Sequence, residues 1–254
     1  ETAIFFDDDR RYADLLNGYI FDGKQVIMEK QLYSQDTRET GKSQKDSWGV
    51  QKRKKIQRFR DGVKRVAIGT SFTIIALEHQ DKIHRGMPVR VMVEDALSYD
   101  RQMKKLQKQN REKGVLNKKD YISSLTDTDV LTPVVTIVIY YGEEPWNNSK
   151  DIYDILAHKD LPEEIKTFIN HYPRRVLDVR RFTNEECFQT DVREVFGFIR
   201  RSLDKEAVKQ YLKEREEQFT NIDEDAYDLI AAMTDTKQLQ MVKDKYRSEE
   251  GGIN

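Results

Sequence analysis

Hydrophobic and polar positions follow two kinds of period along this chain, and together they predict both helices and strands. After the acidic run at 7–9, hydrophobic residues at helical spacing predict a first helix that ends near Gly23. Residues 72–77 and 134–141 are hydrophobic on both faces, which predicts central strands covered by helices. Beyond them, we expect a helix at 162–170, a strand at 174–182 and helices from about 185 onward.

A long helix is expected between Pro88, which suits a first turn, and Gly114, which suits a C-terminal cap. Its hydrophobic stripe should pack on the sheet while its basic C-terminal half faces solvent. The stripe consists of Val89, Met92, Val93, Ala96, Leu97 and Met103.

The strand at 72–80 ends in Glu78 and Gln80, which point to the same face because side chains alternate along a strand. A carboxylate buried there costs several kcal/mol, in order of magnitude, unless it is paired or bound to a metal. If 61–68 pairs back through a two-residue turn at Gly69 and Thr70, then Asp61 faces Glu78. Opposed carboxylates repel unless a cation or proton lies between them, so the pattern predicts a divalent metal. A slip of one residue would instead put Asp61 on the other face.

These residues also carry a family resemblance. The order of Asp61, a hydrophobic strand, Glu78 and Gln80 resembles the PD-(D/E)XK nuclease superfamily. Several segments resemble its Rpn branch more closely, the recombination-promoting nucleases or transposases of bacteria, over about residues 10 to 180. They are RYADLLN at 11–17, LEHQ at 77–80, MPVR at 87–90, DALSY at 95–99 and YYGEEPW at 140–146.

The resemblance implies a fold and an activity. The fold would be an α/β restriction-endonuclease-like core over 1–200, with a mixed central sheet flanked by helices, followed by a helical C-terminal extension over 201–254. The activity would be DNA cleavage that depends on Mg²⁺ (or Mn²⁺). The resemblance also links this activity to recombination or mobile elements. Asp61, Glu78 and the backbone carbonyl of His79 would bind the metal, and Gln80 would stand where the superfamily usually has lysine.

Gln80 changes the expected chemistry, because an amide can orient a water molecule but supplies no positive charge. More of the activation then falls on the metal, which can lower the pKa of a bound water. Two alternatives remain open. The chain is an idle nuclease fold that only binds nucleic acid or a partner, or Asp61 and Glu78 are structural and are paired with Arg60 or Arg90.

Charge is strongly segregated, although the formal net charge is only -1. Residues 42–65 carry ten Lys or Arg against two acidic residues, and residues 101–119 carry eight against one. Two basic segments beside the proposed site suit a DNA backbone. The candidate contacts are Lys52, Arg53, Lys54, Lys55, Arg58, Arg60, Lys104, Lys105 and Lys108.

Cysteine content and hydrophobic run length indicate the expected cellular location of the protein. Cys187 is the single cysteine of the chain, which suits a reducing compartment, and the cytoplasm is the expected location. The longest hydrophobic run is far shorter than the roughly 20 residues that span a bilayer, so no membrane partner is expected. The C-terminal region is compatible with a lid, a homodimer surface or further packing, and the sequence does not choose among them. Asp14 falls opposite the hydrophobic stripe of the first helix, which favours a solvent-facing role over metal binding. His79 and Trp146 are expected to pack against the body of the protein.

Overall fold

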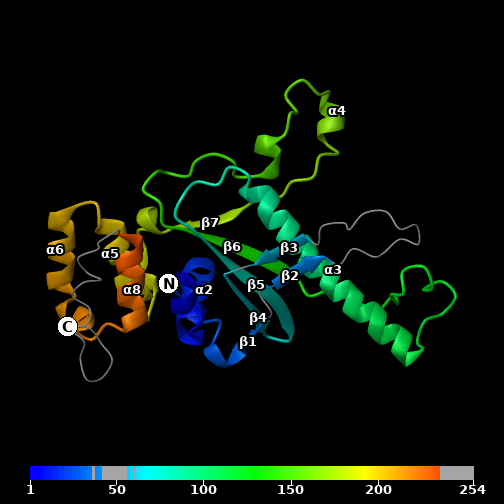
Figure 1. Ribbon diagram of the computed structural model, residues 1–254, viewed down its shortest axis with the longest axis horizontal. Helices are drawn as coiled ribbons and strands as arrows, with labels where there is room; N and C mark the ends of the chain where they lie inside the picture. Colours follow the sequence, from blue (N-terminus) through cyan, green and yellow to red (C-terminus); the bar gives the residue numbers. More distant parts are fainter. Residues whose placement is uncertain (36–37, 42–55, 60, 235–254) are drawn as a thin grey trace.

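A mixed β-sheet lies at the centre of the protein, with helices on both faces (Figure 1). The structure is a computed structural model that describes residues 1–35, 38–41, 56–59 and 61–234. Within these residues the main sheet has the strand order β1-β4-β5-β6-β7. Its strands are β1 (Leu32–Ser34), β4 (Gly62–Ile68), β5 (Ser71–Gln80), β6 (Val134–Tyr140) and β7 (Arg175–Asp178). The mixed α/β architecture agrees with the class expected from the sequence.

The hairpin of β4 and β5 confirms the predicted register. Ile68 lies opposite Ser71 and Gly62 lies opposite Leu77. Gly69 has φ = 58°, a left-handed conformation that glycine adopts without strain, at the first position of the tight turn. Strand β5 then pairs in parallel with β6, and β6 in parallel with β7.

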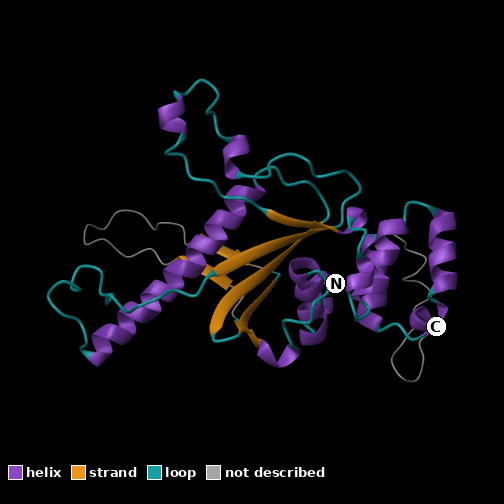
Figure 2. Cartoon of the chain, turned by 180° about the vertical axis from the view of Figure 1, so that it is seen from behind, coloured by secondary structure: helices purple, strands orange, loops and turns teal. Residues whose placement is uncertain are grey.

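Helices cover the two faces of the sheet differently. On one face lies α2 (Asp9–Phe21), whose Tyr12 hydroxyl donates to the carbonyl of Ile75 at 2.8 Å. As predicted, the acidic run caps this helix, because the Asp8 side chain accepts the N–H groups of residues 10 and 11. On the other face lies α3 (Met87–Lys113), which runs across the strands and extends beyond them (Figures 1 and 2). Gly114 ends α3 with φ = 63°, as expected.

The face that α3 turns to the sheet differs from the prediction. Its buried positions after the first turn include Val91, Glu94, Asp95 and Ser98, whereas Val89 of the predicted stripe is 39% exposed and Ala96 is also exposed. The sheet face beneath α3 is hydrophobic in part, at Val138 and Tyr140, but it also carries polar groups: Asp95, for example, accepts the Thr136 hydroxyl at 2.6 Å. The helix therefore buries a polar stripe that matches polar groups of the sheet, which hydrophobic periodicity alone does not detect.

The C-terminal helices join the main core. They are α5 (Val192–Arg201), α6 (Lys205–Glu214), α7 (Glu216–Thr220) and α8 (Glu224–Met233). Phe196 from α5 and Leu229 from α8 belong to the same buried cluster as Leu77 of the sheet. This packing links α8 to the sheet, and the proposed boundary at residue 200 stays a prediction.

The remaining elements are short. They are α1 (Thr2–Phe5), η1 (Glu29–Gln31), η2 (Ile152–Ile155), α4 (Glu163–Lys166), η3 (Val179–Arg181), η4 (Glu185–Cys187) and a hairpin of β2 (Arg38–Gly41) and β3 (Ile56–Phe59) beside α3. The predicted helix at 162–170 is thus only the four residues of α4, and the predicted strand at 174–182 is β7 followed by η3.

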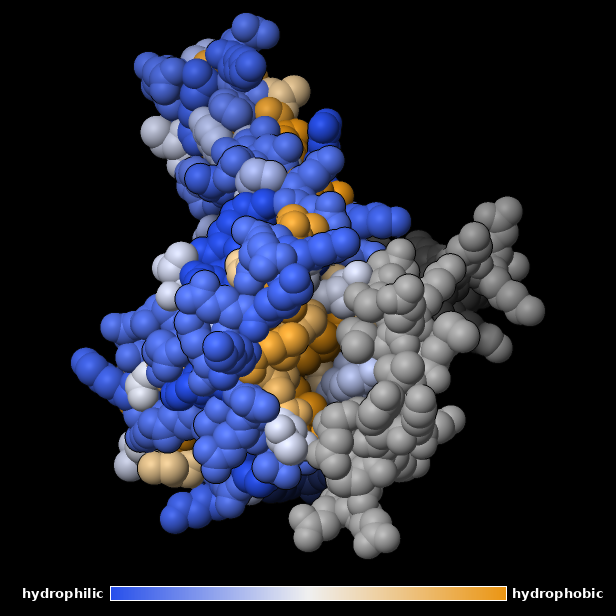
Figure 3. All heavy atoms as spheres, turned by 90° about the vertical axis from the view of Figure 1, so that its left-hand side faces the viewer, coloured by the Kyte–Doolittle hydropathy of each residue, from blue (hydrophilic) through white to orange (hydrophobic). Residues whose placement is uncertain are grey.

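The surface is largely hydrophilic on the side of α5, α6 and α8, where a hydrophobic hollow opens near the middle (Figure 3). The chain between β6 and β7 projects from the body and carries α4 (Figure 1). In this projection Phe168 is 82% exposed. None of the helices within the described part of the chain is both long and hydrophobic enough to span a membrane.

Candidate functional site

Asp61 and Glu78 lie at neighbouring positions at the end of the β4–β5 hairpin. Extending the observed register by one pair beyond Gly62 and Leu77 places Asp61 opposite Glu78. Asp61 is exposed, and its Oδ2 accepts the backbone N–H of His79 at 2.8 Å. Because the β4–β5 ladder stops at Gly62, this carboxylate takes the place of the next backbone acceptor. The contact fixes Asp61 beside the peptide that joins Glu78 to His79.

Glu78 is fully buried and forms an ion pair with α3. Its Oε2 lies 2.7 Å from Nη2 of Arg90, whose Nε donates to Oε1 of Glu94 at 3.0 Å. Burial acts to lower the pKa of the Arg90 guanidinium, but Glu78, Glu94 and Asp61 together raise it above its usual value. Arg90 therefore stays charged and faces three carboxylates. The sequence named Arg90 as one possible partner of Glu78, and the structure confirms that contact; Arg60, the other, lies outside the described residues.

Glu94 is a site residue that the sequence analysis missed. It lies one helical turn beyond Arg90 and is also fully buried. Spacing of four residues on a helix places the two side chains next to each other, so the pair was a signal available in the sequence. The hydrophobic stripe assigned to α3 hid it, because that stripe put Glu94 on a solvent face.

His79 points to the opposite face of the sheet, as expected for a packed residue. Its ring stacks between Phe6 and Tyr141, with centroids 5.5 Å and 5.9 Å away, and Nδ1 lies 3.2 Å from the Tyr141 hydroxyl. Burial lowers the pKa of His79 to about 3, so the ring is neutral near pH 7. Burial, followed by the charge of Asp61, raises the pKa of Tyr141 well above its usual value. Both side chains are therefore uncharged supports of the site.

Gln80 follows on the Glu78 face and is half-buried. Its Nε2 donates to the carbonyl of His79 at 2.8 Å, the carbonyl that the resemblance nominates as a metal ligand. This bond holds the amide against the backbone, so that its oxygen is the atom that can accept a further hydrogen bond. A cleft of about 800 Å³ adjoins Gln80 and includes Tyr140 and Arg180 in its lining.

The donor atoms of the site suit magnesium. Mg²⁺ prefers hard oxygen ligands and is commonly held by one or two carboxylates while it keeps several waters. Asp61 offers an exposed carboxylate, and Glu78 offers a buried one that already balances the positive charge of Arg90. Among the described residues, no cluster of three or more Asp, Glu, His or Cys has the arrangement of a metal site. The site thus fits an ion held by two carboxylates and water, not an all-protein cage.

Of the predicted nucleic-acid contacts, the lysines of α3 are exposed. Lys104 pairs with Asp100, and Lys108 lies 3.7 Å from Glu112, whereas Lys105 forms no ion pair within the part of the chain that is described. Lys52, Arg53, Lys54, Lys55 and Arg60 lie outside the described residues, and Arg58 is described only as part of β3.

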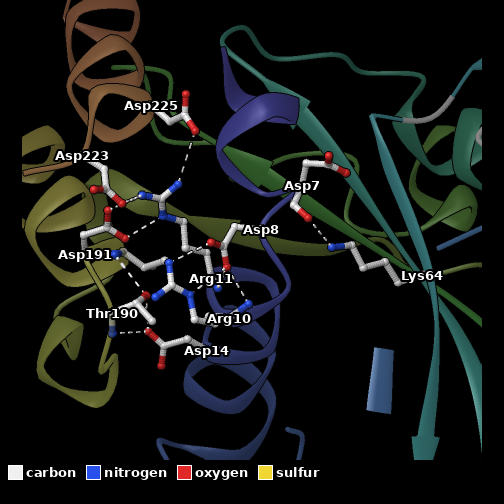
Figure 4. A network of polar contacts seen from close by, with 11 residues as sticks. Asp7, Asp8, Arg10, Arg11, Asp14, Lys64, Thr190, Asp191, Asp223 and Asp225 are labelled. Carbon is white, nitrogen blue, oxygen red and sulfur yellow. Dashed lines mark hydrogen bonds and ion pairs between the residues drawn. The ribbon is translucent and has the colours of Figure 1, made fainter. Parts of the chain in front are cut away.

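Asp14 lies away from this site and is not exposed to solvent, which corrects the prediction. It is 4% exposed, and its oxygens accept the backbone N–H groups of Gln189 and Thr190 at 2.7–2.9 Å (Figure 4). Asp14 thereby binds the segment that leads into α5. The hydrophobic stripe of α2 misled the prediction because the opposite side of this helix is covered by that segment.

The same region holds a buried ion-pair network (Figure 4). Arg11 of α2 is 4% exposed, donates to both oxygens of Asp191 at 2.7–2.8 Å and reaches Asp223 at 2.6 Å. The network fastens α2 to the chain before α5 and to the start of α8. Lys64 of β4 is likewise buried, and it donates to the carbonyl of Asp7 at 2.7 Å. One cation of the first basic segment is thus structural.

Comparison with known proteins adds one match. A family model described as "Putative transposase, YhgA-like" matches residues 66–230. The match covers Glu78, Gln80 and Arg90, and begins just after Asp61. No curated protein and no solved structure matches the chain.

Proposed function

Since this chain belongs to the YhgA-like transposase family, we propose that it is a metal-dependent DNA endonuclease of PD-(D/E)XK type. The family points to a function linked to mobile elements, and a transposase-like protein acts on DNA. One observation supports the proposed nuclease activity: Asp61 lies opposite Glu78 at the end of the β4–β5 hairpin, and Asp61 accepts a hydrogen bond from the His79 N–H group.

In this proposal Asp61 and Glu78 hold Mg²⁺ or Mn²⁺, together with the carbonyl of His79. An ion held there would supply a water of lowered pKa and would offset charge on the scissile phosphate. Gln80, which is held by its bond to the His79 carbonyl, uses its side-chain oxygen to orient the attacking water. The neutral ring of His79 anchors the strand end without adding charge.

Arg90 takes over the role left open by Gln80. A lysine at position 80 would bring a positive charge to the end of β5, and Arg90 brings one to Glu78 from α3 instead. Glu94 holds the guanidinium in place from one turn farther along the helix. In the proposed reaction this cation stabilises the negative charge that develops on the phosphate.

The direct test uses supercoiled plasmid with the purified protein. We expect nicking in Mg²⁺, no nicking with a chelator, and loss of nicking in Asp61→Asn, whose exposed side chain can be changed without opening the core. Asp127→Asn is the matched control, since Asp127 is also an exposed aspartate but lies outside the site. Cutting by Asp61→Asn at the rate of the unmodified protein would exclude the proposed site.

A second candidate is a nucleic-acid-binding protein that retains the fold but does not cleave. The ion pair of Arg90 with Glu78 favours it, because the buried carboxylate is already balanced without a metal. This candidate predicts salt-sensitive DNA binding that is unaffected by Asp61→Asn or by chelator, and no nicking under any metal.

A further inference from the structure

A cavity of about 350 Å³ lies between the sheet and the middle of α3, away from the candidate active site. Three cationic side chains contribute to its lining: Arg65 from β4, and Arg101 and Lys105 from α3. Among the described residues that line it, none is acidic. The cleft beside Gln80 differs, because its lining contains Glu143 and Glu144. As far as the described residues line it, the cavity under α3 therefore carries positive charge and no competing carboxylate.

Arg65, one of these cations, is held in place by an aromatic ring. The Arg65 guanidinium carbon lies 3.7 Å from the centre of the Phe72 ring, a cation–π contact. Within the described part of the chain, neither Arg65 nor Lys105 forms an ion pair, and Lys105 is exposed. Side chains that keep their charge without a carboxylate partner are suited to binding an external anion.

The cavity and the candidate active site share one face of the sheet. Arg65 pairs with Ile74 in the register in which Asp61 falls opposite Glu78, so all four residues lie under α3. Asp61 and Arg65 are four residues apart, which is about 13 Å along a strand. On the helix, Arg90 and Arg101 are eleven residues apart, or about 16 Å at 1.5 Å per residue. The spacing along the strand and the spacing along the helix both place the cavity about 13–16 Å from the candidate active site.

From this arrangement we infer that the cavity binds the sugar–phosphate backbone of a DNA strand at a fixed distance from the proposed cleavage site. Successive phosphates of one strand rise about 3.4 Å along the duplex axis and also rotate around it, so the anchor would lie within a few nucleotides of the scissile phosphate. The inference rests on the proposed function for the identity of the ligand. A backbone phosphate carries no sequence information, so the anchor sets position and affinity, not base preference.

The three lysines of α3 that the sequence nominated for DNA contact have different places relative to this cavity. Lys105 belongs to the anchor, whereas Lys104 and Lys108 face acidic residues of their own helix and lie outside the cavity. Lys108→Ala is therefore a matched control for Lys105→Ala, with the same residue type on the same helix and similar exposure.

The test measures binding of a labelled DNA duplex by fluorescence anisotropy over a range of salt, with chelator present so that no cleavage occurs. The slope of log K against log salt falls in magnitude by about 0.9 for each phosphate contact that is lost. We expect that reduction in Lys105→Ala, about twice as much in Lys105→Ala with Arg65→Gln, and no change in Lys108→Ala. Thermal unfolding of each variant establishes that it is folded, and Lys105→Arg should restore the slope.

An unchanged slope in both Lys105→Ala and the double variant would overturn the inference, as would the absence of DNA binding by the unmodified protein. If inorganic phosphate raises the melting temperature of the unmodified protein more than chloride of equal ionic strength does, while the double variant keeps the full DNA slope, the cavity is a free-anion site and the backbone anchor is rejected. A reduced slope in a protein that never nicks plasmid would support the anchor and refute only the proposed cleavage.

Discussion

The ion pair between Arg90 and Glu78 makes a quantitative prediction about stability. Arg90→Met keeps the length of the side chain but removes the cation that faces Glu78 and Glu94, both of which are fully buried. Removing one partner of a buried ion pair costs about 3–5 kcal/mol. Arg90 itself is 28% exposed, so water screens part of the interaction, and we expect a loss near 3 kcal/mol at neutral pH.

Urea denaturation followed by circular dichroism measures this loss as a lower midpoint. Arg85→Met is the control, because Arg85 is exposed, lies just before α3 and has no ion pair in the described structure; its effect should stay within about 0.5 kcal/mol. If Arg90→Met is as stable as Arg85→Met, Arg90 does not balance the charge of Glu78, and the stabilising role of this ion pair is refuted.

The same variant separates the roles of arginine and metal. Without the guanidinium, Mg²⁺ becomes the available cation for Asp61 and Glu78, and a ligand at ten times its Kd stabilises the folded state by about 1.4 kcal/mol. Mg²⁺ should therefore raise the urea midpoint of Arg90→Met more than that of the unmodified protein. Adding Asp61→Asn to Arg90→Met should abolish this extra rise in the midpoint. Identical responses to Mg²⁺ in all three proteins would count against the metal site.

Three further predictions concern the supports of the fold. Because burial lowers the folded pKa of His79 to about 3, below the unfolded value of about 6.5, the unfolded state binds the extra proton first and stability falls as pH drops below about 6.5. Between pH 6.5 and 4.5 the free energy of unfolding should fall by about 2 kcal/mol. The fall should be absent in His79→Phe. It should remain in His84→Phe, the control at an exposed histidine. Arg11→Met should cost about 3–5 kcal/mol by urea denaturation, whereas Asp225→Asn should cost less than about 1 kcal/mol, because Asp225 is 49% exposed and 3.7 Å away. Asp14→Ala should cost about 1.5–3 kcal/mol, since two backbone N–H groups lose a charged acceptor, and an effect below about 0.5 kcal/mol would contradict that role.

The parts of the fold that the sequence predicted best are those fixed by local chemistry. The turn at Gly69 sets the pairing of its two strands, and the register then follows residue by residue to Leu77. The caps at Asp8 and Gly114 likewise mark helix ends through their own backbone conformations. Such features depend on a few neighbouring residues, so one sequence is enough to find them.

The polar side of α2 and the buried face of α3 were assigned incorrectly because burial there depends on distant segments. Asp14 is buried by Gln189 and Thr190, far away in the chain, and Asp95 is buried because it meets Thr136 of the sheet. A hydrophobic stripe reports where water is avoided, but not where polar groups satisfy one another. The contact of Arg90 with Glu78 is of this second kind, and the sequence named it only as one of two possible partners.

The central claim is that Asp61 and Glu78 form a metal-dependent cleavage site, and plasmid nicking tests it most directly. The unmodified protein, Asp61→Asn and Asp127→Asn should be assayed side by side with Mg²⁺, with Mn²⁺ and with chelator. We expect metal-dependent nicking by the unmodified protein and Asp127→Asn, and none by Asp61→Asn. Nicking that persists in Asp61→Asn, or that needs no metal, would contradict it.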